Sequence, residues 1–153
     1  MAGITLYGWE ELEKGLQRMG SQKTVDGICK RSIYEGAAVI ADELGDAVDA
    51  VPKSKDRFKG LTDRQARDLK ASVGISKMKN DGGAWNCAAG FDGYNEFGQP
   101  NVMLARVWEG GSSKNPATHA FSGAIKAAKA KAQSAMADRA NEDFENVAEK
   151  AFK

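Results

Sequence analysis

The chain has 153 residues, of which 42% are hydrophobic and 28% charged, and its formal net charge is +1. This length and composition favour one globular domain spanning residues 1–153. Two cysteines and one histidine exclude a disulfide framework and make a histidine-based metal site hard to assemble. No apolar run approaches the ~20 residues of a membrane-spanning helix, and the first residues lack a signal-peptide pattern. We therefore expect no membrane partner and no secretion by that route.

The charges are arranged in blocks. Residues 1–52 carry five basic and nine acidic side chains, whereas residues 53–79 carry nine basic and three acidic ones. Residues 80–111 are acidic again, with one basic and four acidic side chains. Alternating blocks on a nearly neutral chain suit surfaces that pair with other protein surfaces, because a dedicated nucleic-acid binder usually carries a strong basic excess.

The N-terminal third is predicted to be mostly helical. Residues 3–7 favour a short strand, and apolar residues at spacings of three and four over residues 9–19 predict a short helix. A longer helix is expected from Thr24, its N-cap, to about Ala50, because Pro52 pushes the residue before it out of the helical region.

The apolar face of this longer helix defines one half of the expected core. Its helix-packing residues recur at spacings of three and four, and they include Ile33, Ile40 and Leu44. Gly36 and Gly45 lie in the same helix, where the lack of a side chain lets another backbone come close.

The middle of the chain predicts a loop, a short helix and a hairpin. Residues 53–61 form a basic connection without regular structure, and residues 62–70 form a helix capped by Thr62. Alternating residues over 71–79 and the return over 84–91, joined by the turn sequence NDGG, predict a β-hairpin. Residues 102–108 favour a short helix that ends at Gly110, with a strand as the alternative.

The C-terminal segment is the clearest helix prediction. Residues 121–151 contain no proline, and as one helix they would span ~46 Å at 1.5 Å per residue. We expect this helix to pack on the 24–50 helix through four residues of one face, which are Ile125, Ala128, Ala132 and Met136. The predicted fold is therefore α+β, with a small antiparallel β-sheet packed against two long helices. The C-terminal helix is longer than the domain needs, which indicates contacts beyond this chain.

Motifs for catalysis are missing. The sequence contains no phosphate-binding loop, no nucleophile elbow and no metal-binding cysteine or histidine pair. His119 is the only side chain with an ordinary pKa near neutrality, and we interpret it as a residue at the start of the C-terminal helix. A small hydrolase or transferase using His119 with Glu109 or Asp92 as acid and base stays open as an alternative.

The basic segment is the strongest candidate for binding. Its loop carries Lys53, Lys55, Arg57 and Lys59, followed by three more cations up to Lys70. Such a cluster can contact phosphates in a salt-dependent way, which leaves a nucleic-acid-binding module over residues 53–79 as an alternative function. The cations can equally pair with acidic patches of this chain or of a neighbouring subunit.

Several short motifs, taken together in chain order, resemble one protein family. Residues 8–12 and Leu16 resemble a "GLDELxxxL" helix, and residues 51–52 and 69–74 match the two ends of "APVDTGxLRxSI", with the basic loop inserted between them. Residues 104–112 resemble "YAxxVEFGT" with Glu109 on its glutamate, and residues 116–125 resemble "PAxPFLRPAL", with His119 and Gly123 replacing prolines. This pattern is similar to the small neck and tail-completion proteins of long-tailed double-stranded-DNA phages.

The resemblance implies a structural virion protein that is not an enzyme and needs no cofactor. It would form a homo-oligomeric ring, with a hexamer favoured, in the neck or at the top of the tail around the DNA channel. Its partners would be the adjacent head-closure and tail-tube or tail-terminator proteins, with non-specific contact to phage DNA, and it would pass through the host cytoplasm during assembly. The candidate contacts at a subunit interface or the DNA channel are Lys53, Lys55, Arg57, Lys59 and Glu109.

Overall fold

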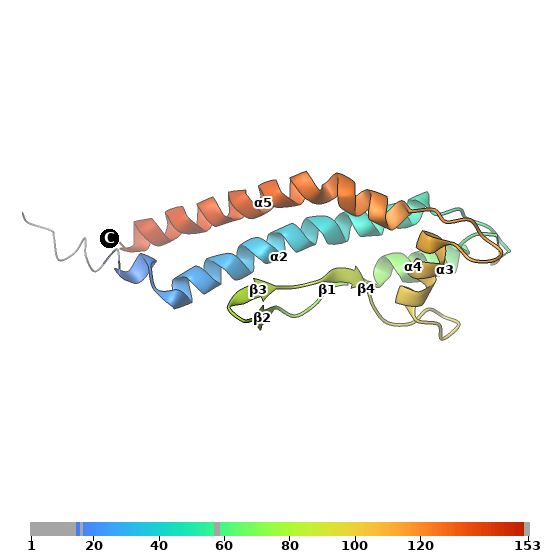
Figure 1. Ribbon diagram of the computed structural model, residues 1–153, viewed down its shortest axis with the longest axis horizontal. Helices are drawn as coiled ribbons and strands as arrows, with labels where there is room; N and C mark the ends of the chain where they lie inside the picture. Colours follow the sequence, from blue (N-terminus) through green and yellow to red (C-terminus); the bar gives the residue numbers. More distant parts are fainter. Residues whose placement is uncertain (1–14, 16, 57–58, 152–153) are drawn as a thin grey trace, which may run out of the picture.

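The computed structural model describes residues 15, 17–56 and 59–151, and it has the predicted α+β fold. Two long helices, α2 (Gln22–Ala47) and α5 (Ala120–Ala151), pair along their length, and α2 lies between α5 and the strands (Figure 1). The other elements are a 3-10 turn (Val48–Ala50), α3 (Asp63–Ala71), β1 (Val73–Ile75), β2 (Lys79–Asp81), β3 (Ala84–Asn86), β4 (Ala89–Phe91) and α4 (Asn101–Gly110). No helix of these residues is both long and apolar enough to cross a bilayer.

The N-terminal caps of two helices were predicted from the sequence, and one of them is at the predicted residue. Thr62 caps α3 as predicted, and its reciprocal hydrogen bonds with Gln65 form a capping box. The cap of α2 is Ser21, three residues before the predicted Thr24, because the Ser21 hydroxyl accepts a hydrogen bond from the backbone N–H of Thr24. The strand predicted over residues 3–7 lies outside the described residues, as does most of the helix predicted over residues 9–19.

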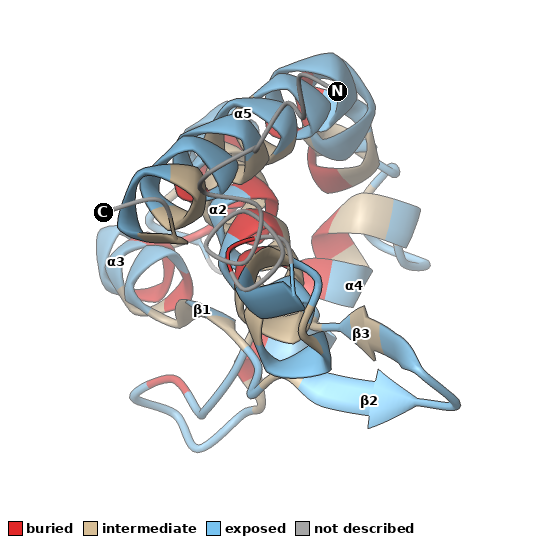
Figure 2. Cartoon of the chain, turned by 90° about the vertical axis from the view of Figure 1, so that its left-hand side faces the viewer, coloured by how far each residue is buried: buried red, intermediate tan, exposed pale blue. Residues whose placement is uncertain are grey.

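The hydrophobic core lies at one end of the long helix pair. Leu44 of α2 and Val48 and Val51, which follow that helix, form part of this core. They pack with Leu61, Leu69, Trp108 and Phe121 from the shorter elements and the start of α5. Figure 2 shows buried residues where α2 meets α5 and on the inner faces of α3 and α4. The remaining length of α5 lies outside this core and packs on α2.

The α2–α5 contact depends on small residues. Ala128 and Ala132 of α5 are buried, and Gly36 of α2 lies against Ala132 and Met136. A Cβ atom built on Gly36 would be 2.5 Å from Met136 Cγ and 3.3 Å from the carbonyl oxygen of Ala132. The predicted close approach at Gly36 is therefore present, whereas a Cβ atom on Gly45 would meet only Lys70, at 4.0 Å.

The packing face of α5 departs from the predicted one at both ends. Ile125, a predicted packing residue, is 42% exposed, because the face runs from Phe121 through the partly buried Ala124 to Ala128. Near the C-terminus the buried position is Asp143, 5% exposed, while Phe144 is 46% exposed. A prediction based on apolar spacing does not include acidic residues, so it missed Asp143, which is buried because Arg31 and Arg139 neutralise its charge.

The predicted hairpin divides into two short ladders in place of one sheet. β1 pairs with β4 through Val73 and Phe91, and β2 pairs with β3 through Lys79 and Asn86. Three residues on one arm, 76–78, face two on the other, 87–88, so the register shifts by one residue as at a β-bulge. Gly82 and Gly83 of the turn have positive φ angles, as the NDGG sequence predicts.

The strands pack against α2 through polar contacts as well as apolar ones. Trp85 Nε1 donates a hydrogen bond to Asp26 at 3.0 Å, and the ammonium of Lys30 lies 3.8 Å from the Trp85 ring centroid. These contacts hold the β2–β3 ladder against α2. The sheet was predicted to pack on two long helices, and the one that it packs on is α2.

Candidate functional site

The basic loop is closed at its base. The backbone N–H of Leu61 donates to the Pro52 carbonyl at 2.8 Å, and that of Ser54 donates to the Leu61 carbonyl at 3.0 Å. Leu61 is fully buried, and a Cβ atom on Gly60 would lie 2.6 Å from the Pro52 carbonyl oxygen. The connection predicted to lack structure is therefore held to the core where it begins and ends.

The loop forms one wall of an open groove of about 610 Å³. Four cations line this groove, together with two carboxylates and one aromatic ring: Lys53, Lys55, Arg64, Arg67, Asp63, Glu96 and Phe97. We call it the basic groove. Its other walls are the first turns of α3 and the loop that follows β4. The capping box at Thr62 fixes the start of α3 and so sets the positions from which both arginines extend.

The loop that carries Phe97 is ordered by a buried amide. The Asn95 carboxamide oxygen accepts backbone hydrogen bonds from Phe97 at 2.9 Å and from Gln99 at 3.0 Å. Glu96 joins the loop to α3, because its carboxylate lies 3.1 Å from Arg64 Nη1 and its backbone N–H donates to Asp68. No sequence motif singles out Asn95, Glu96 or Phe97; the three glycines in residues 90–100 are the only sign of a loop at this position.

Some cations of the segment are neutralised within the chain. Asp49 accepts hydrogen bonds from Lys70 Nζ at 2.9 Å and from Lys53 Nζ at 3.1 Å. These two contacts, that of Lys70 foremost, lower the pKa of Asp49, and the contact with Asp49 raises the pKa of Lys70. Of the four cations of the basic groove, Lys55 and Arg67 have no ion pair with a described residue, so these two can bind an acidic partner.

The remaining predicted loop cations are placed differently. Lys59 is exposed, lies 3.9 Å from Asp56 and does not line the basic groove. Arg57 lies outside the described residues. The structure thus brings Lys53 and Lys55 together with the two arginines of α3, and this combination can hold an acidic surface or a phosphate chain by charge.

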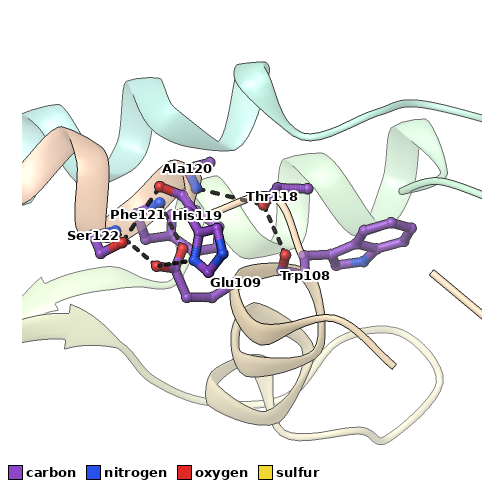
Figure 3. A network of polar contacts seen from close by, with 7 residues as sticks. All are labelled: Trp108, Glu109, Thr118, His119, Ala120, Phe121 and Ser122. Carbon is purple, nitrogen blue, oxygen red and sulfur yellow. Dashed lines mark hydrogen bonds and ion pairs between the residues drawn. The ribbon is translucent and has the colours of Figure 1, made fainter. Parts of the chain in front are cut away.

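Glu109 has a role inside the chain. It lies in the last turn of α4, and its carboxylate accepts backbone hydrogen bonds from Phe121 at 2.9 Å and Ser122 at 3.1 Å (Figure 3). It thereby caps the first turn of α5, where free N–H groups favour a negative charge. Burial raises its pKa, but the hydrogen bonds from Ser122 and Phe121 outweigh this and lower the pKa overall. Both carboxylate oxygens are thus used within the chain, and we propose no contact of Glu109 with a neighbouring subunit or with DNA.

His119 lies beside this cap. Its Nδ1 is 4.0 Å from Glu109 Oε1, its side chain is largely exposed, and its backbone has a φ of 51° (Figure 3). Asp92, the other carboxylate of the enzyme alternative, accepts a hydrogen bond from the backbone of Gly93. Across residues 15, 17–56 and 59–151 there is no group of three histidine, cysteine or acidic residues that could hold a metal ion.

Comparison with protein-family models, with curated proteins and with solved structures finds no match to this chain.

Proposed function

We propose that the protein is a structural subunit of a tailed-phage virion, which forms a homo-oligomeric ring in the neck or at the top of the tail. The ring surrounds the DNA channel and joins the head to the tail, with a hexamer as the favoured state. The adjacent head-closure and tail-tube or tail-terminator proteins are its neighbours. The proposal rests on the order of the sequence motifs together with the shape of the molecule.

The observation that carries this proposal is the long helix pair. α5 has 32 residues, which corresponds to ~48 Å. Only its start contributes to the hydrophobic core, and the rest packs on α2 alone. A helix pair that extends beyond its own core and keeps Phe144 exposed presents surface that a monomer does not need. Ring subunits use such surface to contact the next copy.

In this proposal the basic groove meets an acidic surface of the neighbouring ring. Lys55 and Arg67 are free to make such pairs, and each subunit of the ring repeats them. Placing them against protein leaves the lumen less attractive to phosphates, which favours the passage of DNA.

A nucleic-acid-binding module is the second candidate, and one observation favours it. The Phe97 side chain is exposed on the basic groove beside its lysines and arginines. An aromatic face among cations is the combination that holds single-stranded nucleic acid by stacking and charge. Retention of the protein by DNA that weakens steeply between 50 and 200 mM salt would favour this module.

The experiment that tests the proposed function is to locate the protein in the particle. Antibody labelling of the parent virion in electron micrographs should mark the junction of head and tail. Loss of the protein should leave filled heads and separate tails. Normal, infectious particles without this protein would contradict the proposal.

A further inference from the structure

The basic groove offers a partner fewer charges than its four cations suggest. Two of them, Lys53 and Arg64, each lie 3.1 Å from a carboxylate oxygen of this chain. The other two, Lys55 and Arg67, are exposed and have no ion pair with a described residue. Two positive charges on this groove are therefore available to a partner.

An apolar ring lies beside these charges. The Phe97 side chain is 52% exposed, and among the described residues that line the groove it is the only aromatic one. Its backbone N–H donates to the carboxamide of the buried Asn95, and the backbone N–H of Glu96 donates to Asp68 of α3. The backbone that carries the ring is thereby fixed before a partner arrives, which lowers the entropy that binding costs.

Two carboxylates also line the groove, and they favour a peptide over a phosphate chain. Asp63 lies in the first turn of α3, the place at which a helix would otherwise attract an anion. A phosphate chain would meet Asp63 and Glu96 with like charge, and its backbone has no hydrogen-bond donors. A peptide has backbone N–H groups, from which these carboxylates can accept hydrogen bonds.

Single-stranded nucleic acid needs more contact points than the groove offers. In such sites successive bases stack on several aromatic side chains, and many cations contact the phosphates. The described lining supplies one ring and two cations without a partner inside the chain. One apolar side chain and two carboxylates match this supply, and a short acidic peptide contains both.

The groove also has the size and the fixed walls of a peptide site. Its volume of about 610 Å³ lies within the ~300–1,000 Å³ of sites that enclose a drug-sized ligand. Each wall is anchored: the basic loop by the buried Leu61, the start of α3 by the capping box at Thr62, and the third wall by Asn95. Such a groove takes a few residues of a chain and not the whole face of a domain.

We infer that the basic groove binds a short acidic segment of the neighbouring protein, whose two carboxylates pair with Lys55 and Arg67 and whose apolar side chain packs on Phe97. This inference rests on the proposed function, which gives the groove an acidic protein surface as its partner, and it names the form of that surface. Charge-assisted hydrogen bonds to the two cations attract and orient the segment. The contact with Phe97 selects segments that carry an apolar residue beside their carboxylates.

Binding of labelled peptides tests this contact in solution with the full-length protein. The probes are a panel of fluorescein-labelled peptides in which a phenylalanine lies between two glutamates, at several spacings. In fluorescence polarisation at low salt at least one member should bind, and glutamine in place of both glutamates should weaken binding ~5-fold or more. Absence of binding by every member at millimolar concentration, or equal binding of the glutamine peptides, would overturn the inference.

Variants of exposed residues assign the binding to the groove. Lys55→Ser with Arg67→Ser should weaken the bound peptide ~5-fold or more, whereas Lys77→Ser with Lys79→Ser, outside the groove lining, should not. Phe97→Ser should weaken the phenylalanine peptide and leave its serine counterpart unchanged. Equal weakening by both lysine-containing pairs would overturn the inference. Tighter binding of a twelve-nucleotide oligothymidylate, lost in the groove variants alone, would overturn it in favour of the nucleic-acid module.

Carbodiimide cross-linking in the particle separates this inference from the proposed function. The reagent activates a carboxyl group, which then forms an amide with a lysine amine, so Lys55 should become linked to an acidic residue of a different protein. Lys55→Arg keeps the charge and should assemble but lose the link, while Lys77→Arg should keep it. A link from Lys55 to a second copy of this chain, or no link in particles that contain the protein, would overturn the inference and leave the ring standing. Peptide binding by a protein absent from the head–tail junction would contradict the proposed function alone.

Discussion

At the scale of single residues, two carboxylates stabilise the ends of α5. Glu109 accepts the first free N–H groups of this helix, and Asp143 lies buried near its other end. Neither role could be predicted from the sequence. The spacing of apolar residues predicts which face of a helix is buried. It does not predict which acidic side chain caps a helix terminus or lies between two arginines.

Substitution of Glu109 should change the pH dependence of stability. The pKa of Glu109 is lower in the folded protein than its ordinary value of 4.5. Its stabilisation is therefore fully present above that value and is lost as the pH falls through the folded pKa. Glu109→Gln should lower the free energy of unfolding at pH 7 by ~1 kcal/mol, as for a lost helix cap.

The measurement is thermal unfolding of both proteins between pH 7 and pH 3. The difference between wild type and Glu109→Gln should shrink as the solution becomes acidic. Glu145→Gln, an exposed position on α5, serves as the control and should leave the curve unchanged. A constant difference across this pH range would contradict the capping role.

Asp143 is expected to contribute more than a surface ion pair. Its carboxylate lies 2.7 Å from Arg31 Nε and 3.3 Å from Arg139 Nη2. Asp143→Asn removes the charge that both guanidinium groups face, so we expect a loss of ~1–3 kcal/mol in urea unfolding. Glu142→Gln, one residue away and largely exposed, should cost under ~1 kcal/mol. Equal losses of unfolding free energy for the two substitutions would contradict the larger contribution expected of the buried Asp143.

At the scale of elements, the helices followed from the sequence and the ladder register did not. The spacing of apolar residues, the capping residues and the helix-ending prolines and glycines predicted the bounds of α2, α3, α4 and α5 to within a few residues. The extra residue in 76–78 has no sequence signal, so the division of the hairpin into two ladders was not foreseen. Likewise, the loop that completes the basic groove is held by Asn95, whose burial depends on tertiary contacts.

Two glycines of the helix pair should respond in opposite ways to the same substitution. A Cβ atom on Gly36 would be 2.5 Å from Met136 Cγ and 3.3 Å from a backbone oxygen, so Gly36→Ala crowds the α2–α5 contact and should destabilise the fold by ~1 kcal/mol. Gly123 has open space around it, so Gly123→Ala should stabilise α5 by ~0.5–1 kcal/mol. Melting of both variants by circular dichroism checks the pair. Stabilisation by Gly36→Ala would contradict the close approach of the helices.

At the scale of the whole molecule, the proposed ring repeats the basic groove around one annulus. Lys55→Ser combined with Arg67→Ser removes the two cations of the basic groove that have no ion pair with a described residue. Failure of heads to join tails, with normal retention of DNA, is the expected result if the groove faces protein. Normal joining with leakage of DNA would place the groove in the lumen. Lys77→Ser with Lys79→Ser removes the same charge from the hairpin and should affect neither.

Subunit number is the most direct test of the account. The mass of the purified wild-type protein, measured by native mass spectrometry and checked by electron microscopy, should be an integral multiple of 16.4 kDa with closed, annular particles. A head-to-tail contact that closes predicts one dominant ring size without a dimer as end point. A protein that stays at 16.4 kDa throughout the micromolar range, or that stops at a two-fold dimer, would contradict the ring.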